Sequence, residues 1–342
     1  MNYTQATDEI EQLKIGNIVP DTKKLLQFFC EKMGQILPGK IIYVPKGYEN
    51  DSIGEVMEKI LKEHKVCAGR FTSYAIKKRT GHIFVNGKNI SQKEYAALAE
   101  KILELGNDLT QTEINFLIAL KCFTEKKCDY IILSDGHESY DIDVEIHKRT
   151  LQKQIFSTKE YKELEMCSAS KKDIKNSAVA IYLLNKQGIE LKETAVRKAL
   201  KSEMNSGRFE IVKSKPYFIL DGANDGKSTQ ELMANLQYYF PENPYIFIVG
   251  TLQYGYEKVL KECAYMAGHI ITVTVPENRN ALSAIELAEE FAKLNPNITN
   301  ASSLEEALEI SMILAGKDAV IVAFGTTCIL GPLMEIIERK QK

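Results

Sequence analysis

Residues 46–52, which read Lys-Gly-Tyr-Glu-Asn-Asp-Ser, are the part of the chain with the clearest potential for phosphate chemistry. They lie between a short apolar run, residues 40–44, and an amphipathic run, residues 53–64, so the pattern predicts a strand, a loop and a helix. Such a loop can present backbone N–H groups and a helix N-terminus to phosphates, usually with a lysine as a point charge. Glu49 and Asp51 oppose that function because two carboxylates repel a phosphate. The segment is therefore expected to be a plain strand-to-helix turn.

The cysteines, the histidines and two candidate serines show no spacing that is typical of a catalytic or metal site. The seven cysteines contain no C-x-x-C pair and the five histidines no i,i+4 pair, so neither a disulfide framework nor a zinc site is expected. Ser73 and Ser134 lack the Gly-x-Ser-x-Gly setting of a nucleophilic serine. The formal net charge of −2 and the absence of a long apolar run argue against nucleic-acid and membrane partners. The polar N-terminus has no apolar signal core, which predicts a cytoplasmic protein.

The C-terminal part alternates apolar, strand-like runs with amphipathic, helical runs. This alternation predicts parallel strands joined by crossover helices. The strand-like runs are apolar throughout, as expected for strands covered on both faces. We therefore expect a Rossmann-like domain here. The expected strands are residues 217–221, 245–250, 269–275 and 319–325, and the expected helices are residues 228–239, 256–266, 281–294 and 303–314.

The N-terminal part alternates in the same way but less regularly. Asn86-Gly87 predicts a tight turn, and Ser91 with Glu94 three residues later predicts a capping box at a helix start. Residues 143–175 are charged and are expected to be mostly helical, without a strand. The expected strands are residues 40–44, 82–85 and 129–133, and the expected helices are residues 53–64, 112–124 and 174–184.

These patterns place the chain in the α/β fold class with two domains. The length of 342 residues agrees with two domains of ordinary size. The expected boundary lies near Ser206-Gly207, which gives a first domain of residues 1–205 and a second of residues 206–342.

Six segments carry a resemblance to a known family. They are Gly69-Arg-Phe-Thr-Ser73 with Ile83-Phe-Val-Asn-Gly-Lys-Asn-Ile-Ser91, Leu109-Thr-Gln-Thr-Glu-Ile114, Asn176-Ser-Ala-Val-Ala180, Gly207-Arg-Phe-Glu210, Leu220-Asp-Gly-Ala-Asn224 and Phe324-Gly-Thr326. Read in order over about residues 40–330, they resemble the folylpolyglutamate synthase/dihydrofolate synthase family of the Mur ligase superfamily. The resemblance implies an N-terminal P-loop-type domain and a C-terminal Rossmann-like domain. It also implies a reaction in which MgATP activates a folate or pteroate carboxylate as an acyl phosphate, and the amino group of glutamate then forms an amide.

The resemblance also implies nucleotide-binding residues at five positions. Ser52 would remain from the phosphate-binding loop, and Asn176 would contact the base. Arg208 would reach the phosphates from the domain boundary. Asp221 matches the aspartate at the end of the first C-terminal strand, where Asn224 replaces the family's histidine.

For a magnesium ion, the resemblance points to Ser73 and Asp135. Ser73 matches the serine of the family's Thr-Ser-Pro loop, although Tyr74 replaces the proline. The family's metal-binding glutamate corresponds to Ser134, so Asp135 could substitute only if the strand end shifts by one residue. Such a shift normally turns a side chain to the other face of the sheet.

Several positions depart from the family's pattern. Asn50 stands where the family has the phosphate-loop lysine, Ser134 where it has the metal-binding glutamate, and no counterpart of its second metal segment lies between Asp141 and Lys175. Loss of one preorganised group at a developing charge typically lowers the rate by about 10²–10³. No cofactor is therefore expected, and ATP with Mg²⁺ only if the chain is active.

Two functions follow from these observations. The first is a binding or regulatory protein that has lost ATP-dependent ligation, with an intact ligase paralogue or a small carboxylate- or peptide-like ligand as its partner. The alternative is a divergent ATP-dependent amide ligase that joins an amino acid such as glutamate to a carboxylate substrate, with Lys46, Asp135 and Arg208 in new roles. Nucleotide binding distinguishes the two.

Overall fold

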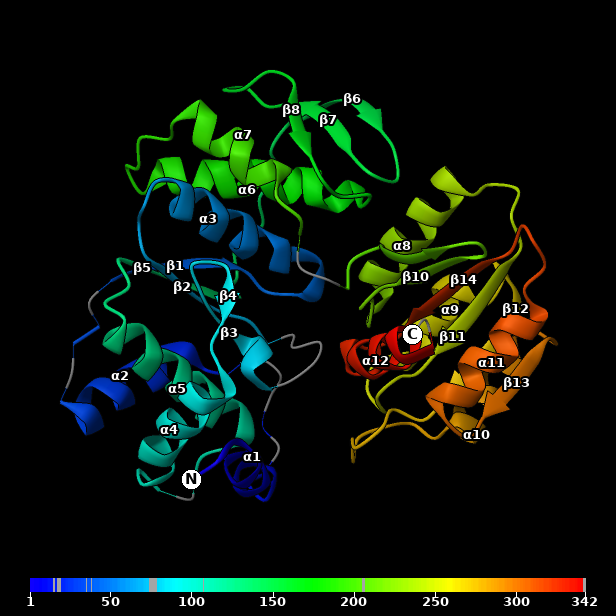
Figure 1. The fold of residues 1–342 in the computed structure, drawn as a ribbon, viewed down its shortest axis with the longest axis horizontal. Coiled ribbons are helices and arrows are strands. Elements are labelled where there is room, and N and C mark those ends of the chain that lie inside the picture. The colour runs from blue at the N-terminus through cyan, green and yellow to red at the C-terminus, as the bar shows by residue number, and fades with distance from the viewer. Residues whose placement is uncertain are drawn as a thin grey trace. The chain divides into compact units, whose positions relative to one another are not determined.

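The computed structural model describes residues 1–14, 16, 20–34, 36–37, 39–73, 79–106, 108–204 and 207–340. The chain forms two compact α/β units (Figure 1). Unit 1 comprises Met1–Ile146, Phe156–Met166 and Asp173–Ser202, and unit 2 comprises His147–Ile155, Cys167–Lys172 and Glu203–Lys342. The predicted domain boundary falls on residues 205 and 206, which lie outside the described ranges, and it remains a prediction. Among the described helices, none is long and apolar enough to cross a membrane.

Unit 1 is built on a five-stranded sheet with the order β1-β5-β2-β3-β4. Strands β1, β5 and β2 are parallel, whereas β3 and β4 form an antiparallel hairpin. In Figure 1, α3 and α6 lie on one side of this sheet and α4 and α5 on the other. The strands are β1 Lys40–Pro45, β2 Ala68–Phe71, β3 Ile83–Val85, β4 Lys88–Asn89 and β5 Tyr130–Gly136, and the helices are α1 Tyr3–Glu11, α2 Thr22–Met33, α3 Asp51–Glu63, α4 Gln92–Leu103, α5 Gln111–Glu125, α6 Lys171–Lys186 and α7 Glu193–Lys201.

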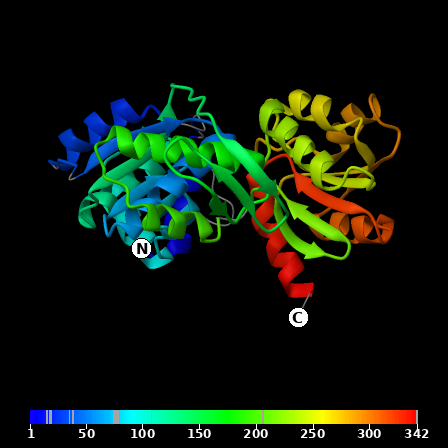
Figure 2. The same cartoon turned by 90° about the horizontal axis from the view of Figure 1, so that it is seen from above.

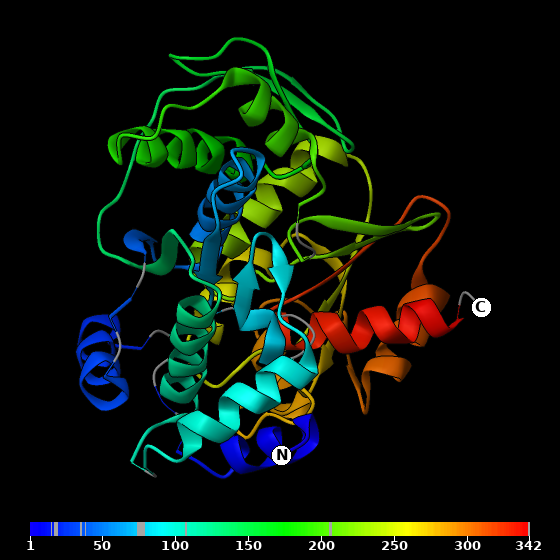
Figure 3. The same ribbon diagram turned by 60° about the vertical axis from the view of Figure 1, so that its left-hand side comes forward.

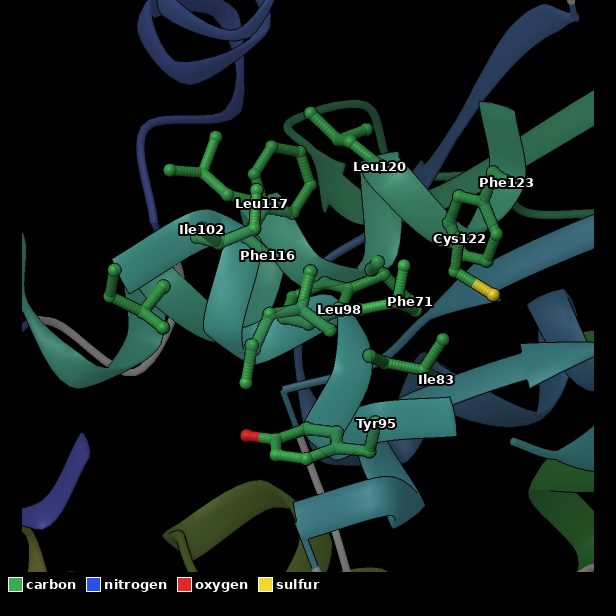
Figure 4. Close-up of a cluster of buried hydrophobic side chains, with 14 of the residues drawn as sticks. Phe71, Ile83, Tyr95, Leu98, Ile102, Phe116, Leu117, Leu120, Cys122 and Phe123 are labelled. Carbon is green, nitrogen blue, oxygen red and sulfur yellow. The ribbon is translucent and has the colours of Figure 1, made fainter. Parts of the chain in front are cut away.

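The main core of unit 1 lies where α4 and α5 pack on the sheet (Figure 4). Phe71 of β2 meets Phe116 of α5 edge to face, with ring centroids 5.2 Å apart. Gly69 lets α5 approach β2 closely, because a Cβ there would lie 2.3 Å from the ring of Phe123. Each fully buried side chain of this size contributes roughly 1.5–3 kcal/mol to folding.

Two local predictions for this unit concern the hairpin and the helix that follows it. The hairpin, drawn as two cyan arrows in Figure 3, turns at Asn86 and Gly87 with φ angles of 52° and 76°, so the predicted tight turn is confirmed. Ser91 caps α4 by accepting a hydrogen bond from the Glu94 N–H at 3.1 Å, as predicted. The prediction of a complete capping box is wrong, because the Glu94 carboxylate pairs with Lys126 at 2.7 Å instead of accepting a hydrogen bond from the Ser91 N–H.

Unit 2 contains a six-stranded sheet with the order β13-β12-β11-β14-β10-β9. All of its pairings are parallel except that of β9 with β10, so the predicted Rossmann-like alternation is confirmed. The sequence did not predict β9, β13 or the last helix, α12, which is red in Figure 2 and packs against α11. The strands are β9 Glu210–Ser214, β10 Tyr217–Leu220, β11 Tyr245–Val249, β12 Ala267–Val273, β13 Ile298–Ala301 and β14 Val320–Phe324, and the helices are α8 Gly226–Tyr239, α9 Tyr256–Cys263, α10 Ala284–Ala292, α11 Leu304–Leu314 and α12 Leu330–Lys340.

The prediction that residues 143–175 are mostly helical and contain no strand is wrong. This region holds a three-stranded sheet with the order β6-β7-β8, and only its end enters a helix, α6. The strands are three to five residues long, which is too short for an alternating pattern to emerge above the charged composition. They are β6 Glu145–Arg149, β7 Gln154–Ser157 and β8 Leu164–Met166.

Candidate functional site

The candidate phosphate loop lies between β1 and α3 and is closed by its own hydrogen bonds. The Asn50 N–H donates to the Gly47 carbonyl at 3.0 Å, and the Asn50 side-chain amide donates to the Lys46 carbonyl at 2.9 Å. Gly47 has a φ of 113°, a conformation that favours glycine. A short 3-10 turn, Tyr48–Asn50, then leads directly into α3. Asn50 therefore serves the turn itself, where the resemblance implies a lysine directed at phosphate.

The side chain of Glu49 fills the space over the loop glycine. A Cβ built on Gly47 would lie 2.5 Å from Oε2 of Glu49 and 3.1 Å from Oε1. The Asn50 amide also donates to Oε1 of Glu49 at 3.3 Å. A phosphate-binding loop uses glycine so that a phosphate can approach the backbone. Here a carboxylate of the chain lies against the glycine instead.

Asn176 of α6 is fixed to the same loop. Its Nδ2 donates to the Ser52 hydroxyl at 2.7 Å and to the Glu49 carbonyl at 2.7 Å. Asn176 and Ser52 are 1% and 0% exposed. The structure thus brings these two predicted site residues together, and the side-chain amide of Asn176 is bonded to Ser52 and to the loop.

Beneath α3, Arg70 of β2 is completely buried among carboxylates. Its Nε lies 3.2 Å from Glu58, its Nη1 lies 3.4 Å from Asp51, and its guanidinium carbon lies 4.0 Å from the ring centroid of Phe84. Gly54 permits this packing, because a Cβ there would lie 2.9 Å from Cδ of Arg70. Asp51 is in the first turn of α3, so its carboxylate already offsets the positive end of the helix dipole.

Burial sets the protonation behaviour of this cluster. Burial raises the pKa of Glu58 above its ordinary value, although the charge of Arg70 and the Gly87 N–H, 2.6 Å from the carboxylate, oppose that change. Burial alone would lower the pKa of Arg70, but the carboxylates of Asp51 and Glu58 raise it. Arg70 therefore stays charged and holds two acidic side chains of α3.

The end of β5 carries the two residues considered for a metal. Ser134 is 6% exposed, and its hydroxyl makes no hydrogen bond to any residue within the described part of the chain. Asp135, on the opposite face, accepts a hydrogen bond from the hydroxyl of Thr22 at 2.6 Å. Ser73 follows β2, the neighbour of β5. The ranges that the structure describes contain no group of three His, Cys, Asp or Glu residues that could hold a metal.

The residues at this loop do not fit a magnesium–nucleotide complex. Asn50 and Ser134 stand at the positions to which the resemblance assigns the lysine and the metal-binding glutamate, and Glu49 covers Gly47. Tyr74, which the sequence placed beside Ser73, lies outside the described residues.

The other predicted residues lie in unit 2, around the end of β10. Asp221 accepts hydrogen bonds from the Phe209 and Ala223 N–H groups, both at 2.8 Å. These bonds tie the segment that contains Arg208 to the strand end, so Asp221 has a structural role. The Asn224 N–H donates to the hydroxyl of Ser228 at 3.1 Å, within the start of α8.

Sequence reasoning missed two features of the unit 1 site. The first is the Arg70 cluster. Its signal in the sequence is a charged residue between Gly69 and Phe71, which are both buried. The position of the Glu49 side chain over Gly47 had no sequence signal, because it depends on the 3-10 turn.

A known protein family matches part of unit 2 in sequence. Residues 207–327 match the family described as "Mur ligase, glutamate ligase domain". No curated protein matches the chain.

Solved structures match almost the whole chain at low sequence identity. Folylpolyglutamate synthase from Thermotoga maritima is 19% identical with a TM-score of 0.79, and the match covers 99% of this chain and 97% of that one. E. coli FolC in complex with DHPP and ADP is 17% identical with a TM-score of 0.83, covering 100% and 99%. Mycobacterium tuberculosis folylpolyglutamate synthase complexed with ADP is 14% identical with a TM-score of 0.85, covering 98% of each chain. Residues 207–327 therefore resemble a Mur ligase glutamate ligase domain, and the chain has the two-domain α/β fold of the folylpolyglutamate synthases.

Proposed function

We propose that this chain uses the folylpolyglutamate synthase fold for binding or regulation and no longer carries out ATP-dependent ligation. The observation that carries the proposal is the Glu49 carboxylate, which lies against Gly47 in the loop between β1 and α3. The partner would be an intact ligase paralogue or a small carboxylate- or peptide-like ligand, and the site of action would be the cytoplasm.

Electrostatics give the reason why Glu49 opposes a nucleotide. Two like unit charges about 4 Å apart repel by roughly 4 kcal/mol near a protein surface. Since 1.4 kcal/mol corresponds to a factor of ten, this repulsion would weaken phosphate binding by about 10²–10³. The amide of Asn50 offers no compensating charge, because it is neutral and donates within the loop. A triphosphate would have to displace the carboxylate and break these bonds.

The strand that follows supports the same conclusion. Ser134 provides one neutral hydroxyl where the resemblance implies a carboxylate for Mg²⁺, and Asp135 contacts Thr22 on the other face of the sheet. Hard cations such as Mg²⁺ are held mainly by carboxylates together with substrate phosphates. A chain that lacks both the lysine and this carboxylate is poorly equipped to neutralise charge during phosphoryl transfer.

Isothermal titration of the purified chain with MgATP and with a non-hydrolysable analogue tests the proposal. We expect no heat of binding up to millimolar nucleotide. An intact folylpolyglutamate synthase titrated in the same buffer is the positive control. Micromolar affinity for either nucleotide would overturn the proposal.

A second candidate, a divergent amide ligase, is favoured by two specific observations. The described C-terminal residues match a glutamate ligase domain, and the similar FolC and folylpolyglutamate synthase structures are complexes with ADP. In this alternative, Lys46, Asp135 and Arg208 would act on the nucleotide in new roles. Phosphate release on incubation with MgATP, amino acids and carboxylate acceptors would support it, and no release above the buffer rate would exclude it.

A further inference from the structure

Two cysteines that are far apart in the sequence meet where two neighbouring strands of unit 1 begin. Cys67 comes directly before β2, and Cys128 comes two residues before β5. Their sulfur atoms lie 3.7 Å apart, although 61 positions separate the two residues in the chain. Both cysteines are free thiols. The contact results from the parallel pairing of β2 with β5, so the spacing of the cysteines in the sequence showed no sign of it.

Backbone hydrogen bonds hold the two cysteines side by side. The Cys67 carbonyl accepts from the Asp129 N–H at 2.8 Å and from the Tyr130 N–H at 3.2 Å. The Cys67 N–H donates to the Asp129 carboxylate at 2.9 Å. The Cys128 N–H donates to the Phe123 carbonyl at 3.0 Å, which ties this residue to the end of α5. The two thiols therefore stay close together as long as the sheet is intact.

The geometry of the pair is compatible with a disulfide bond. Neighbouring strands lie about 4.8 Å apart, which falls within the roughly 4.4–6.8 Å between the Cα atoms of most disulfides. An S–S bond is about 2.05 Å long, so each sulfur has to move by only about 0.8 Å, which rotation about the Cα–Cβ bonds allows. A zinc site would need more ligands, and within the described ranges no group of three His, Cys, Asp or Glu side chains could hold a metal. Oxidation to a disulfide needs only the two thiols.

The two thiols differ in their access to solvent. Cys67 is partly exposed, whereas Cys128 is buried. An oxidant in solution therefore reaches Cys67 first. Burial, together with the neighbouring Cys67 sulfur, raises the pKa of Cys128, which slows its attack because the thiolate is the nucleophile. Its fixed position beside Cys67 offsets this effect, since well-placed groups reach effective concentrations of about 10⁵ M.

We propose that Cys67 and Cys128 are an oxidative modification site, which hydrogen peroxide converts to a reversible disulfide between the starts of β2 and β5. The Cys67 thiolate attacks one peroxide oxygen and the O–O bond breaks. The second oxygen leaves as hydroxide and takes up the proton that Cys67 lost, which gives water and a sulfenic acid at Cys67. The Cys128 sulfur then attacks the Cys67 sulfur, the S–O bond breaks, and the hydroxyl leaves as water with the proton of the Cys128 thiol. Two thiols are thus oxidised to one disulfide while one peroxide is reduced to two waters.

The cross-link would stabilise unit 1 when it forms. It closes a long loop that contains β3, β4, α4 and α5. Cross-links of long loops stabilise mainly by restricting the unfolded chain. Disulfides in reducing compartments are usually transient and redox-sensing, so a dithiol would return the pair to its reduced form. This inference goes beyond the proposed function and does not depend on whether the chain binds a nucleotide.

The test uses the purified full chain, first reduced and then treated with hydrogen peroxide under native conditions. After iodoacetamide has blocked the remaining thiols, peptide mass spectrometry without reduction should show an intrachain cross-link between Cys67 and Cys128. In calorimetry, an unfolding transition of the oxidised chain should lie about 5–15 °C higher than in the reduced chain. Dithiothreitol should remove both the cross-link and the shift.

Three variants separate the roles of the thiols. Cys128→Ala should stop at the sulfenic acid of Cys67, which dimedone then labels, whereas the unmodified chain should show little labelling. Cys67→Ser should give neither the cross-link nor the thermal shift. Cys122→Ala is the matched control, because it removes another buried thiol of unit 1 and should still form the cross-link. Cys67→Ser changes a partly exposed position, so it keeps the test decisive if Cys128→Ala does not fold.

Four outcomes would overturn the proposal. Peroxide could join Cys128 to Cys122, or could form cross-links only between chains. It could oxidise Cys67 beyond the sulfenic acid without any cross-link in the unmodified chain. The thermal shift could also persist in Cys67→Ser, which would show that oxidation elsewhere in the chain causes it.

Discussion

The side-chain amide of Asn176 lies 2.7 Å from the hydroxyl of Ser52, and both residues are almost completely buried. The same amide nitrogen donates to the Glu49 carbonyl at 2.7 Å. One asparagine of α6 therefore fixes both the turn after β1 and the first turn of α3. The position that the resemblance assigned to base contact is used here to hold the loop closed.

Replacement of this asparagine should destabilise unit 1. Asn176→Ala leaves the Ser52 hydroxyl and the Glu49 carbonyl without this donor inside the protein, and each buried group left unsatisfied costs about 1–3 kcal/mol. We expect the free energy of unfolding to fall by roughly 2–4 kcal/mol in urea titrations. Asn185→Ala, at an exposed position of the same helix, should change it by less than about 0.5 kcal/mol. Equal effects of the two variants would contradict this role.

Loss of Arg70 should be more severe. Arg70→Met removes the guanidinium while keeping much of the volume, and it leaves Asp51 and Glu58 as buried carboxylates without their cation. Breaking a buried pair in this way costs about 3–5 kcal/mol. The additional change Glu58→Gln should recover part of the loss in urea unfolding, because it removes one of the uncompensated charges. If the double variant is no more stable than Arg70→Met, Glu58 is not the source of the destabilisation.

The destabilisation in Arg70→Met should depend on pH through Glu58. The folded chain holds the Glu58 proton more tightly than the unfolded chain, since burial raises the pKa of Glu58 above 4.5. Ionisation of Glu58 therefore lowers stability as pH rises above 4.5. Without Arg70 this pKa rises further, so the difference in unfolding free energy between the two proteins should grow from pH 5 towards pH 7. A constant difference across that window would show that Glu58 does not titrate in it.

The sequence predicted those strands and helices whose hydrophobic patterns extend over several consecutive residues. The strands β10, β11 and β14 are uniformly apolar, and β12 is apolar apart from His269 and Thr272, because a parallel sheet covered on both faces requires apolar side chains. The strands β6, β7 and β8 were missed because three to five charged or mixed residues carry too little periodicity.

The sequence predicted which residue types occupy the candidate site, but it did not predict how their side chains are arranged. The sequence predicted that Glu49 and Asn50 do not suit a phosphate loop, yet it could not show that the Glu49 carboxylate packs on Gly47. It also gave no hint that Asn176 and Ser52, 124 positions apart, form a hydrogen bond. Contacts of this kind are set by tertiary packing of α6 beside α3.

Cysteine reactivity should follow burial. The thiols of Cys122, Cys128 and Cys263 are buried, and burial raises the pKa of each, that of Cys122 to about 12. Because the thiolate is the reactive form, roughly 10⁻⁴ of Cys122 is reactive at pH 8. Exposed Cys328 should therefore react with iodoacetamide far faster under native conditions, as measured by peptide mass spectrometry. Labelling of Cys122 at the rate of Cys328 would contradict the buried packing of α5.

Restoration of the loop should create nucleotide affinity if Glu49 and Asn50 are what prevents it. In Glu49→Gly/Asn50→Lys, the carboxylate over Gly47 is removed and an ammonium is placed before α3, while Asp51 is kept because it pairs with buried Arg70. Charged hydrogen bonds contribute about 1.5–3 kcal/mol each, so MgATP affinity should rise by about tenfold or more in isothermal titration. The matched control is Glu49→Gly/Asn50→Met, which has a side chain of similar length without charge. If the methionine variant gains as much affinity as the lysine variant, the steric effect of Glu49 dominates over charge. If neither variant binds nucleotide better than the unmodified chain, the loop residues are not the cause of the loss.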